Sequence, residues 1–224
     1  MSFFFDTNVC IGFIFRWNPW HDKAKEIFQE KVPSYWSDTV KNESIYVFNK
    51  LNREYDNFLY KLKNGIINYK KDLIKKEDLN KISSKISVGK NQAGKDIIDK
   101  NRIVSSIWED KRWYEVGKNN LIEYLAELII NLSIHSFRGF KKCENILNLH
   151  PSSSSHFSVK NIFLKQGIHF PDWQICLDAH DLACSIQEVV FVTSDYGLIN
   201  LLQPILHETK IKEIFKMDKL NIFP

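Results

Sequence analysis

Blocks of apolar residues separated by polar turns predict alternating strands and helices at both ends of the chain. The short apolar runs at residues 3–5 and Val189–Thr193 are each followed by polar residues, as is typical of buried parallel strands. Shorter strands are predicted at 35–36 and 211–215, and helices at 9–15, 21–31, 38–62, 171–186 and 196–206. Strands that alternate with helices predict an α/β fold, with a parallel central sheet flanked by helices.

The middle of the chain differs in charge from the two ends. Residues 61–118 hold 15 Lys and Arg against 8 Asp and Glu, a local charge of +7, whereas the whole chain carries +4 and the remainder therefore −3. A helix is predicted at 121–132, and loops at 83–100 and 151–155. We therefore expect one domain over residues 1–224 with a mainly helical insert at 61–160. Its mixture of basic and aromatic side chains suits either an RNA clamp or a solvated helical surface with aromatic residues inside.

Composition narrows the class of protein. Of 224 residues 44% are hydrophobic, enough for a sizeable core. None of the four cysteines stands in a CxxC pair, which favours reduced thiols in a cytoplasmic protein. No stretch reaches the ~20 apolar residues of a membrane span, so we expect a soluble protein with no membrane partner.

Acidic residues stand where ordinary surface charge is unexpected. Asp6 ends the first predicted strand, and Asp195 follows the late one. Ligands of open parallel sheets bind outside the carboxyl ends of the strands, so both acids belong to the edge that carries chemistry. Glu43 lies at the inner edge of an early helix, close to its start.

The late helix offers a choice of acid. At 100° per residue, Asp172 heads the buried stripe, at the end where the helix dipole favours an anion. Asp178 falls at the edge of that stripe, about 9 Å further along the axis, and is a reserve candidate. Asp181 is predicted to face water.

Four acids at one sheet edge would repel each other unless a cation lies among them. Oxygen ligands suit Mg²⁺ or Mn²⁺, which can polarise a phosphodiester and activate water. Taken singly, the Asp residues are equally well explained as turn or cap residues.

Together these residues resemble the PIN-domain nucleases. Residues 3–12, FFFDTNVCIG, are similar to the opening strand of that family, and 191–195, FVTSD, are similar to its late strand. Glu43 matches an early helical acid, and Asp172 with Ile175 and Ala179 matches the spacing of a later one. The likeness covers roughly residues 1–60 and 160–215. The gap of 129 residues between Glu43 and Asp172 is longer than in compact members, which leaves the choice between Asp172 and Asp178 open.

The resemblance implies a Rossmann-like PIN fold and a Mg²⁺- or Mn²⁺-dependent endoribonuclease. Asp6, Glu43, Asp172 and Asp195 would be its catalytic and metal-binding acids, with Asn8 and Ser194 as polar neighbours. RNA is the implied substrate. Since many members are the toxins of toxin–antitoxin pairs, an antitoxin is an implied partner, and a homodimer is left open. The alternatives are a PIN-like module that binds RNA or protein without cleaving, and a phosphatase with Asp6 as nucleophile.

Two other patterns have simpler explanations. Residues 89–95, GKNQAGK, fit a phosphate-loop pattern, but Asp96 follows where Ser or Thr is needed, so a lysine-rich surface loop is expected. The seven histidines show no HxxxH or HExxH spacing for zinc, and a structural role is expected for His169 and His180.

Overall fold

The structure is a computed structural model that describes residues 1–91 and 94–219. Contacts divide the chain into two compact units, Met1–Val47 with Gly139–Pro224, and Phe48–Arg138. The predicted residues 92–93 of the phosphate-loop pattern lie outside the described residues. The division into one domain and an insert at 61–160 stays a prediction.

A five-stranded sheet forms the centre of the first unit in the described part of the chain. Its strands lie in the order β5-β2-β1-β6-β7, and every neighbouring pair is parallel. The bounds are β1 Ser2–Phe5, β2 Ser34–Ser37, β5 Asn148–His150, β6 Val189–Thr193 and β7 Glu213–Lys216. The predicted α/β fold with a parallel sheet flanked by helices is confirmed.

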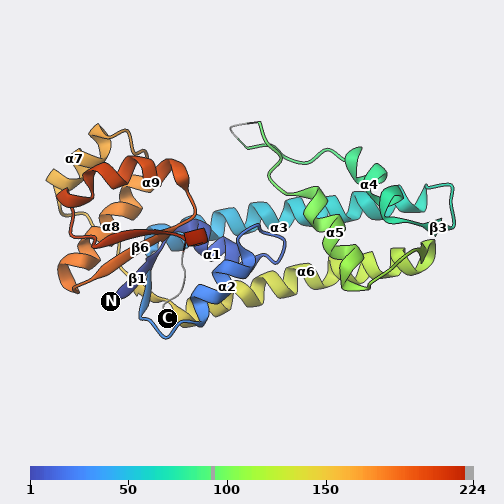
Figure 1. The fold of residues 1–224 in the computed structure, drawn as a ribbon, viewed down its shortest axis with the longest axis horizontal. Helices are drawn as coiled ribbons and strands as arrows, with labels where there is room; N and C mark the ends of the chain where they lie inside the picture. The colour runs from blue at the N-terminus through green and yellow to red at the C-terminus, as the bar shows by residue number, and fades with distance from the viewer. Residues whose placement is uncertain (92–93, 220–224) are drawn as a thin grey trace. The chain divides into compact units, whose positions relative to one another are not determined.

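The two central strands are apolar because both faces of the sheet are covered. Every residue of β1 and β6 is buried, and the rings of Phe4 and Phe191 stack across the two strands with centroids 6.1 Å apart. Helices α1 and α8 both contact β6, which places this strand in the middle of the core (Figure 1).

The helices of the first unit begin close to the predicted positions, except α7, where no helix was predicted. Their bounds are α1 Thr7–Ile14, α2 His21–Gln29, α7 Phe157–Lys165, α8 Asp172–Ser185 and α9 Tyr196–Leu202, with 3₁₀ turns at Gln203–Glu208 and Met217–Lys219. Asp6 and Asp195 cap α1 and α9 through their side chains. The Ser37 hydroxyl accepts a 3.3 Å hydrogen bond from the Val40 backbone and so caps α3, Asp38–Ile67.

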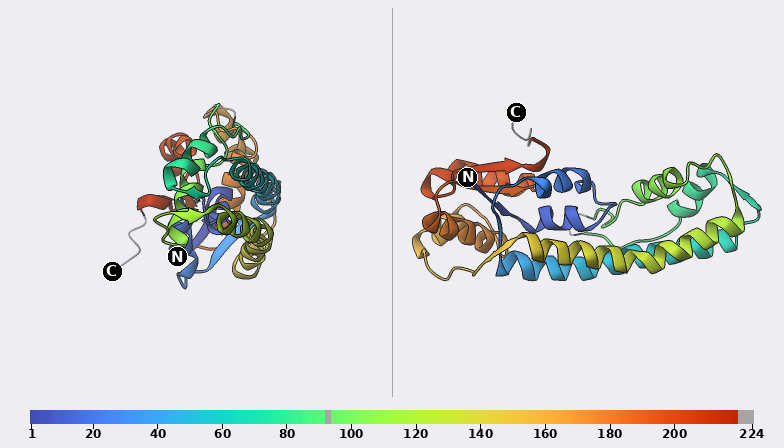
Figure 2. Two further views of the ribbon diagram at one scale, coloured as in Figure 1. Left: turned by 90° about the vertical axis from the view of Figure 1, so that its right-hand side faces the viewer. Right: turned by 90° about the horizontal axis from the view of Figure 1, so that it is seen from below.

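The second unit is mainly helical. It contains the later part of α3, the earlier part of α6 (Lys118–Ile146), and the short helices α4 Lys76–Ser84 and α5 Lys100–Asp110. Here α3 and α6 lie side by side (Figures 1 and 2), where Asn52 accepts from Ser136 at 2.9 Å and donates to Ser133 at 3.2 Å. A small antiparallel pair, β3 Leu73–Ile74 and β4 Val116–Gly117, joins the ends of these elements.

Three predicted boundaries are wrong. Helix α3 continues to Ile67 through the Asn-Gly pair at 64–65 that predicted its end. Burial outweighs the local stop signal, since Leu62 and Ile66 are fully buried. Gly65 serves close packing instead, because a Cβ there would lie 2.5 Å from the Cγ2 of Ile82.

The other two errors concern the length of α6 and strand β5, which was not predicted. Helix α6 extends well beyond the predicted 121–132. Strand β5 was missed because it is only three residues long and two of them are exposed, which leaves no apolar run to detect. No helix among the described residues is long and apolar enough to cross a membrane.

Candidate functional site

Four acids from four segments meet at the carboxyl edge of the sheet. Strands β1 and β6 are paired in register, Phe5 opposite Val192, so Asp6 and Asp195 leave the same edge. The Asp6 amide extends this pairing by donating to the Val192 carbonyl at 3.0 Å. Glu43 comes from the second turn of α3, which follows β2, the other neighbour of β1, and Asp172 is the first residue of α8.

Asp6 is the most enclosed of the four acids, with 3% of its surface exposed. Its carboxylate accepts hydrogen bonds from the Thr193 hydroxyl at 2.6 Å, the Thr7 amide at 2.7 Å and the Asn8 side-chain amide at 3.2 Å. These neutral donors hold the carboxylate in one orientation without cancelling its charge. The predicted neighbour Asn8 therefore does contact the cluster.

Burial and mutual repulsion disfavour the charged state of Asp6. Burial, together with the charges of Glu43 and Asp172, raises its pKa from 3.8 to about 7 against the opposing effect of the Thr193 hydrogen bond. An acid that pays this electrostatic penalty in the folded chain is a good ligand for a cation, because a bound cation would reverse the penalty.

Two further members show the same effect. Burial raises the pKa of Glu43, although its carboxylate accepts a 2.5 Å hydrogen bond from the Thr7 hydroxyl. Burial, followed by the charges of Glu43 and Asp195, raises the pKa of Asp172 to about 6, while His169 opposes the shift. The four acids thus interact as one electrostatic cluster, hereafter the acidic cluster: Asp6, Glu43, Asp172 and Asp195.

The acidic cluster fits a hard divalent cation. In the described part of the chain no lysine or arginine forms an ion pair with any of its four members. Its donors are carboxylate oxygens, the ligands that suit Mg²⁺ or Mn²⁺ rather than softer metals. The donor chemistry and the uncompensated charge therefore agree with the predicted cofactor.

Thr193 and Thr7 are polar contacts that the list of candidate residues omitted. The Thr193 hydroxyl donates to Asp6 and accepts a 3.0 Å hydrogen bond from the Asp195 amide, so one side chain links two acids. Ser194, the predicted neighbour, is half-buried, and none of the hydrogen bonds recorded for the described residues joins it to the cluster. The signal was present in the Thr-x-Asp spacing, because residues two apart in a strand share one side.

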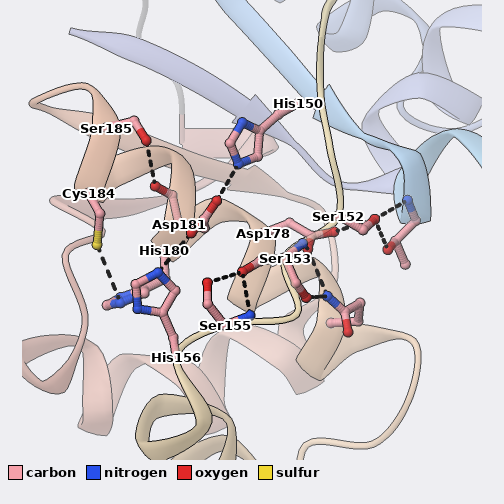
Figure 3. Close-up of polar contacts among 12 residues, drawn as sticks. His150, Ser152, Ser153, Ser155, His156, Asp178, His180, Asp181, Cys184 and Ser185 are labelled. Atoms are coloured by element: carbon pink, nitrogen blue, oxygen red, sulfur yellow. Dashed lines mark hydrogen bonds and ion pairs between the residues drawn. The ribbon is translucent and has the colours of Figure 1, made fainter.

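Asp178 is separate from the acidic cluster. It is fully buried, and its carboxylate accepts hydrogen bonds from the Ser153 amide at 2.8 Å, the Gln174 side chain at 2.8 Å and the Ser152 hydroxyl at 3.2 Å (Figure 3). These contacts anchor the predicted loop at 151–155 to α8. Asp172, and not Asp178, is the α8 acid that interacts with Glu43 and Asp195.

The prediction that Asp181 faces water is wrong. Its two oxygens bind His150 Nε2 at 3.0 Å and His156 Nε2 at 2.7 Å (Figure 3). Burial alone would raise the pKa of Asp181, but the hydrogen bonds from His156 and His150 outweigh it and hold this pKa below its usual value. The angular prediction was wrong because it ignored β5 and the approach to α7, which bring both histidines to this side of α8.

A group of His156, His180 and Cys184 has the residue types of a zinc site. Their ligand atoms all lie within 4.8 Å of one another, and Cys184 Sγ lies 3.6 Å from His180 Nε2 (Figure 3). However, His180 Nδ1 accepts a 3.0 Å hydrogen bond from the Lys210 amide, so the proton of the neutral ring is on Nε2, the atom that faces the sulfur. A zinc-bound Nε2 would require the opposite tautomer, so this arrangement is a hydrogen-bonded network.

The second unit contains a basic cavity of about 410 Å³ along α3 and α4. Three lysines and no acid are among the residues that line it, which are Lys61, Gly65, Asn68, Tyr69, Lys81, Ile82, Lys85 and Ile86. Three of the 15 basic residues of 61–118 therefore lie at this cavity. Whether it holds RNA stays a prediction.

Comparisons with protein-family models, with curated proteins and with solved structures found no match to this chain. The resemblance to PIN-domain nucleases therefore stays a prediction.

Proposed function

We propose that the protein is a metal-dependent endoribonuclease of the PIN type, which hydrolyses RNA phosphodiester bonds at the acidic cluster. The observation that supports this proposal is the convergence of four acids from segments distant in sequence, with no lysine or arginine paired to them among the described residues. Such repulsion destabilises the fold, whereas a bound divalent cation would remove it and could also bind a phosphodiester.

The acids have separable tasks in this proposal. Asp6 is the central ligand, because Thr193, Thr7 and Asn8 fix its carboxylate. Glu43, Asp172 and Asp195 would complete the set of oxygen ligands around one or two Mg²⁺ or Mn²⁺ ions. A bound ion supplies charge stabilisation for the phosphodiester and lowers the pKa of a bound water.

The half-buried Asp172 has a pKa raised to about 6 in the metal-free site. A bound cation would lower this pKa and keep the carboxylate ionised as a ligand. His169 lies near Asp172 and helps to keep it ionised.

The proposal is tested by RNA cleavage in Mn²⁺ or Mg²⁺ with the Asp6→Asn protein. This change keeps the shape and size of the side chain but removes the charge at the centre of the acidic cluster. We expect cleavage of mixed RNAs to depend on the metal and to fall at least about 100-fold in Asp6→Asn. Asp72→Asn, an exposed acid of the second unit, is the matched control and should be unaffected.

Two results would contradict the proposal. Cleavage that survives Asp6→Asn unchanged would come from another site or a contaminant. RNA binding without cleavage in any divalent metal would instead identify a binding module with this fold.

A further inference from the structure

An exposed aromatic turn leads directly into the acidic cluster. Residues 169–173 form a turn closed by a 3.0 Å hydrogen bond from the Trp173 amide to the His169 carbonyl. Asp172 belongs to this turn, with Phe170 two residues before it and Trp173 directly after it. The two aromatic rings lie with centroids 6.1 Å apart.

Phe170 is exposed, with 71% of its surface accessible. Ile168 before it and Ile175 after it are buried, whereas His169 beside it is exposed. The Phe170 ring therefore contributes little to the core, and with Trp173 it offers aromatic surface beside a polar site.

A cation completes the surface. The Lys160 ammonium, from α7, lies 4.2 Å from the centroid of the Trp173 ring. Among the described residues no acid forms an ion pair with Lys160. A positive charge over one ring and a free ring face nearby are the two elements that bind a nucleotide through its phosphate and its base.

We propose that Phe170 and Trp173, with Lys160, form a base-stacking platform that positions an unpaired nucleotide of the RNA beside the acidic cluster. The proposal rests on the nuclease function and names the residues that would select its substrate. A base that is already paired and stacked within a duplex cannot reach such a surface, so the platform favours unpaired RNA. It also draws a polyanion toward carboxylates that would otherwise repel it.

The test is equilibrium binding of a 12-nucleotide single-stranded RNA, of a size that covers one such site, to the full chain in Mg²⁺. The Asp6→Asn protein serves as the parent, so that no cleavage occurs. We expect Phe170→Ala to weaken binding about 5- to 100-fold, the range of one lost base stack. Phe170→Tyr, which keeps the ring, should restore the affinity, and the affinity for a duplex of the same sequence should not change.

A matched control is Phe137→Ala, which removes a ring that is 53% exposed in the second unit. It should bind RNA as the parent does. In the cleaving protein, Phe170→Ala should raise KM while kcat changes by less than about 2-fold. A merely structural role for Phe170 would instead lower the thermal midpoint and would not be restored selectively by a ring.

The outcomes separate this proposal from the nuclease function. Unchanged single-stranded RNA binding in Phe170→Ala, beside normal cleavage by the natural sequence, would refute the platform and leave the nuclease intact. Loss of binding in Phe170→Ala, in a protein that cleaves no RNA, would support the platform and refute the nuclease. Equal weakening of RNA binding by Phe170→Ala and Phe170→Tyr would also refute the base-stacking platform.

Discussion

The two ends of α8 present aspartates in opposite electrostatic settings. Asp172, at the start of the helix, faces other carboxylates, and its pKa is raised to about 6. Asp181, further along the same helix, faces two histidines, and its pKa is lowered. Between them Asp178 is fully buried and satisfied by three neutral donors.

This difference teaches how a structural acid is distinguished from one that is ready to bind a ligand. Burial is not the criterion, because Asp178 is more buried than Asp172. The criterion is whether the chain itself supplies the compensating donors or charges. By that measure folding supplies Asp178 and Asp181 with compensating groups, whereas the charge of Asp172 is left for a ligand to compensate.

The largest expected effect comes from replacing Asp172 and Asp178, one at a time, by Asn. Asp172→Asn should lower metal-dependent cleavage at least about 100-fold with little loss of stability, since it removes repulsion. Asp178→Asn should keep the specific activity but lower the free energy of unfolding by about 1–3 kcal/mol, because an amide NH₂ would replace the oxygen that accepts from the Ser152 hydroxyl. Cleavage rates and thermal melts of the two proteins together check this prediction.

A reversed result, with activity lost in Asp178→Asn and stability lost in Asp172→Asn, would show that the roles along α8 have been assigned the wrong way round. Equal effects of both substitutions on both measurements would remove the distinction altogether.

The next effect concerns the pH dependence of stability without metal. The pKa of Asp6 is raised in the folded state, from 3.8 to about 7, so the folded chain holds a proton that the unfolded chain has released. Its contribution to stability is complete below pH 3.8 and is lost as the pH rises through about 7.

In the presence of a chelator, the natural sequence should therefore lose roughly 2–4 kcal/mol relative to Asp6→Asn between pH 4 and pH 8. Each kcal/mol corresponds to about 2–4 °C in the melting midpoint of a chain of this size. Comparing the two proteins at each pH cancels the contributions of His180 and Asp181, which both retain. A difference in midpoint that is the same at every pH would contradict the raised pKa, and added Mn²⁺ should reduce the difference at high pH.

The smallest effect is expected for Thr193, which links the acidic cluster without belonging to it. Thr193→Val keeps the shape of the side chain but removes the 2.6 Å hydrogen bond to Asp6. We expect the affinity for Mn²⁺ to fall about 10-fold, in the range for side chains that orient metal ligands. Calorimetric titration measures this, with Thr39→Val, an α3 residue whose hydroxyl contacts Ser152, as the control. An unchanged affinity would mean that Asp6 needs no help from β6.

Most of the sheet could be predicted because the local sequence pattern identifies its strands. Buried parallel strands such as β1 and β6 are uninterrupted apolar runs, and the polar residue that ends each run marks the sheet edge. The positions of Asp6 and Asp195 follow from this pattern alone. Strand β5 could not be found in this way, because its short and largely exposed sequence is a strand only through its pairing with β2.

What the sequence alone determined is most strands of the sheet and most of its flanking helices, with the residue type at their ends, since both depend on hydrophobic periodicity and capping within a few residues. Only the tertiary structure decided which acids are compensated, because the compensating groups come from distant parts of the chain: Ser153 on Asp178, and two histidines on Asp181. Electrostatic energy depends on distance in space rather than in sequence. The contrast between Asp172 and Asp178 was therefore undecided until the chain had folded.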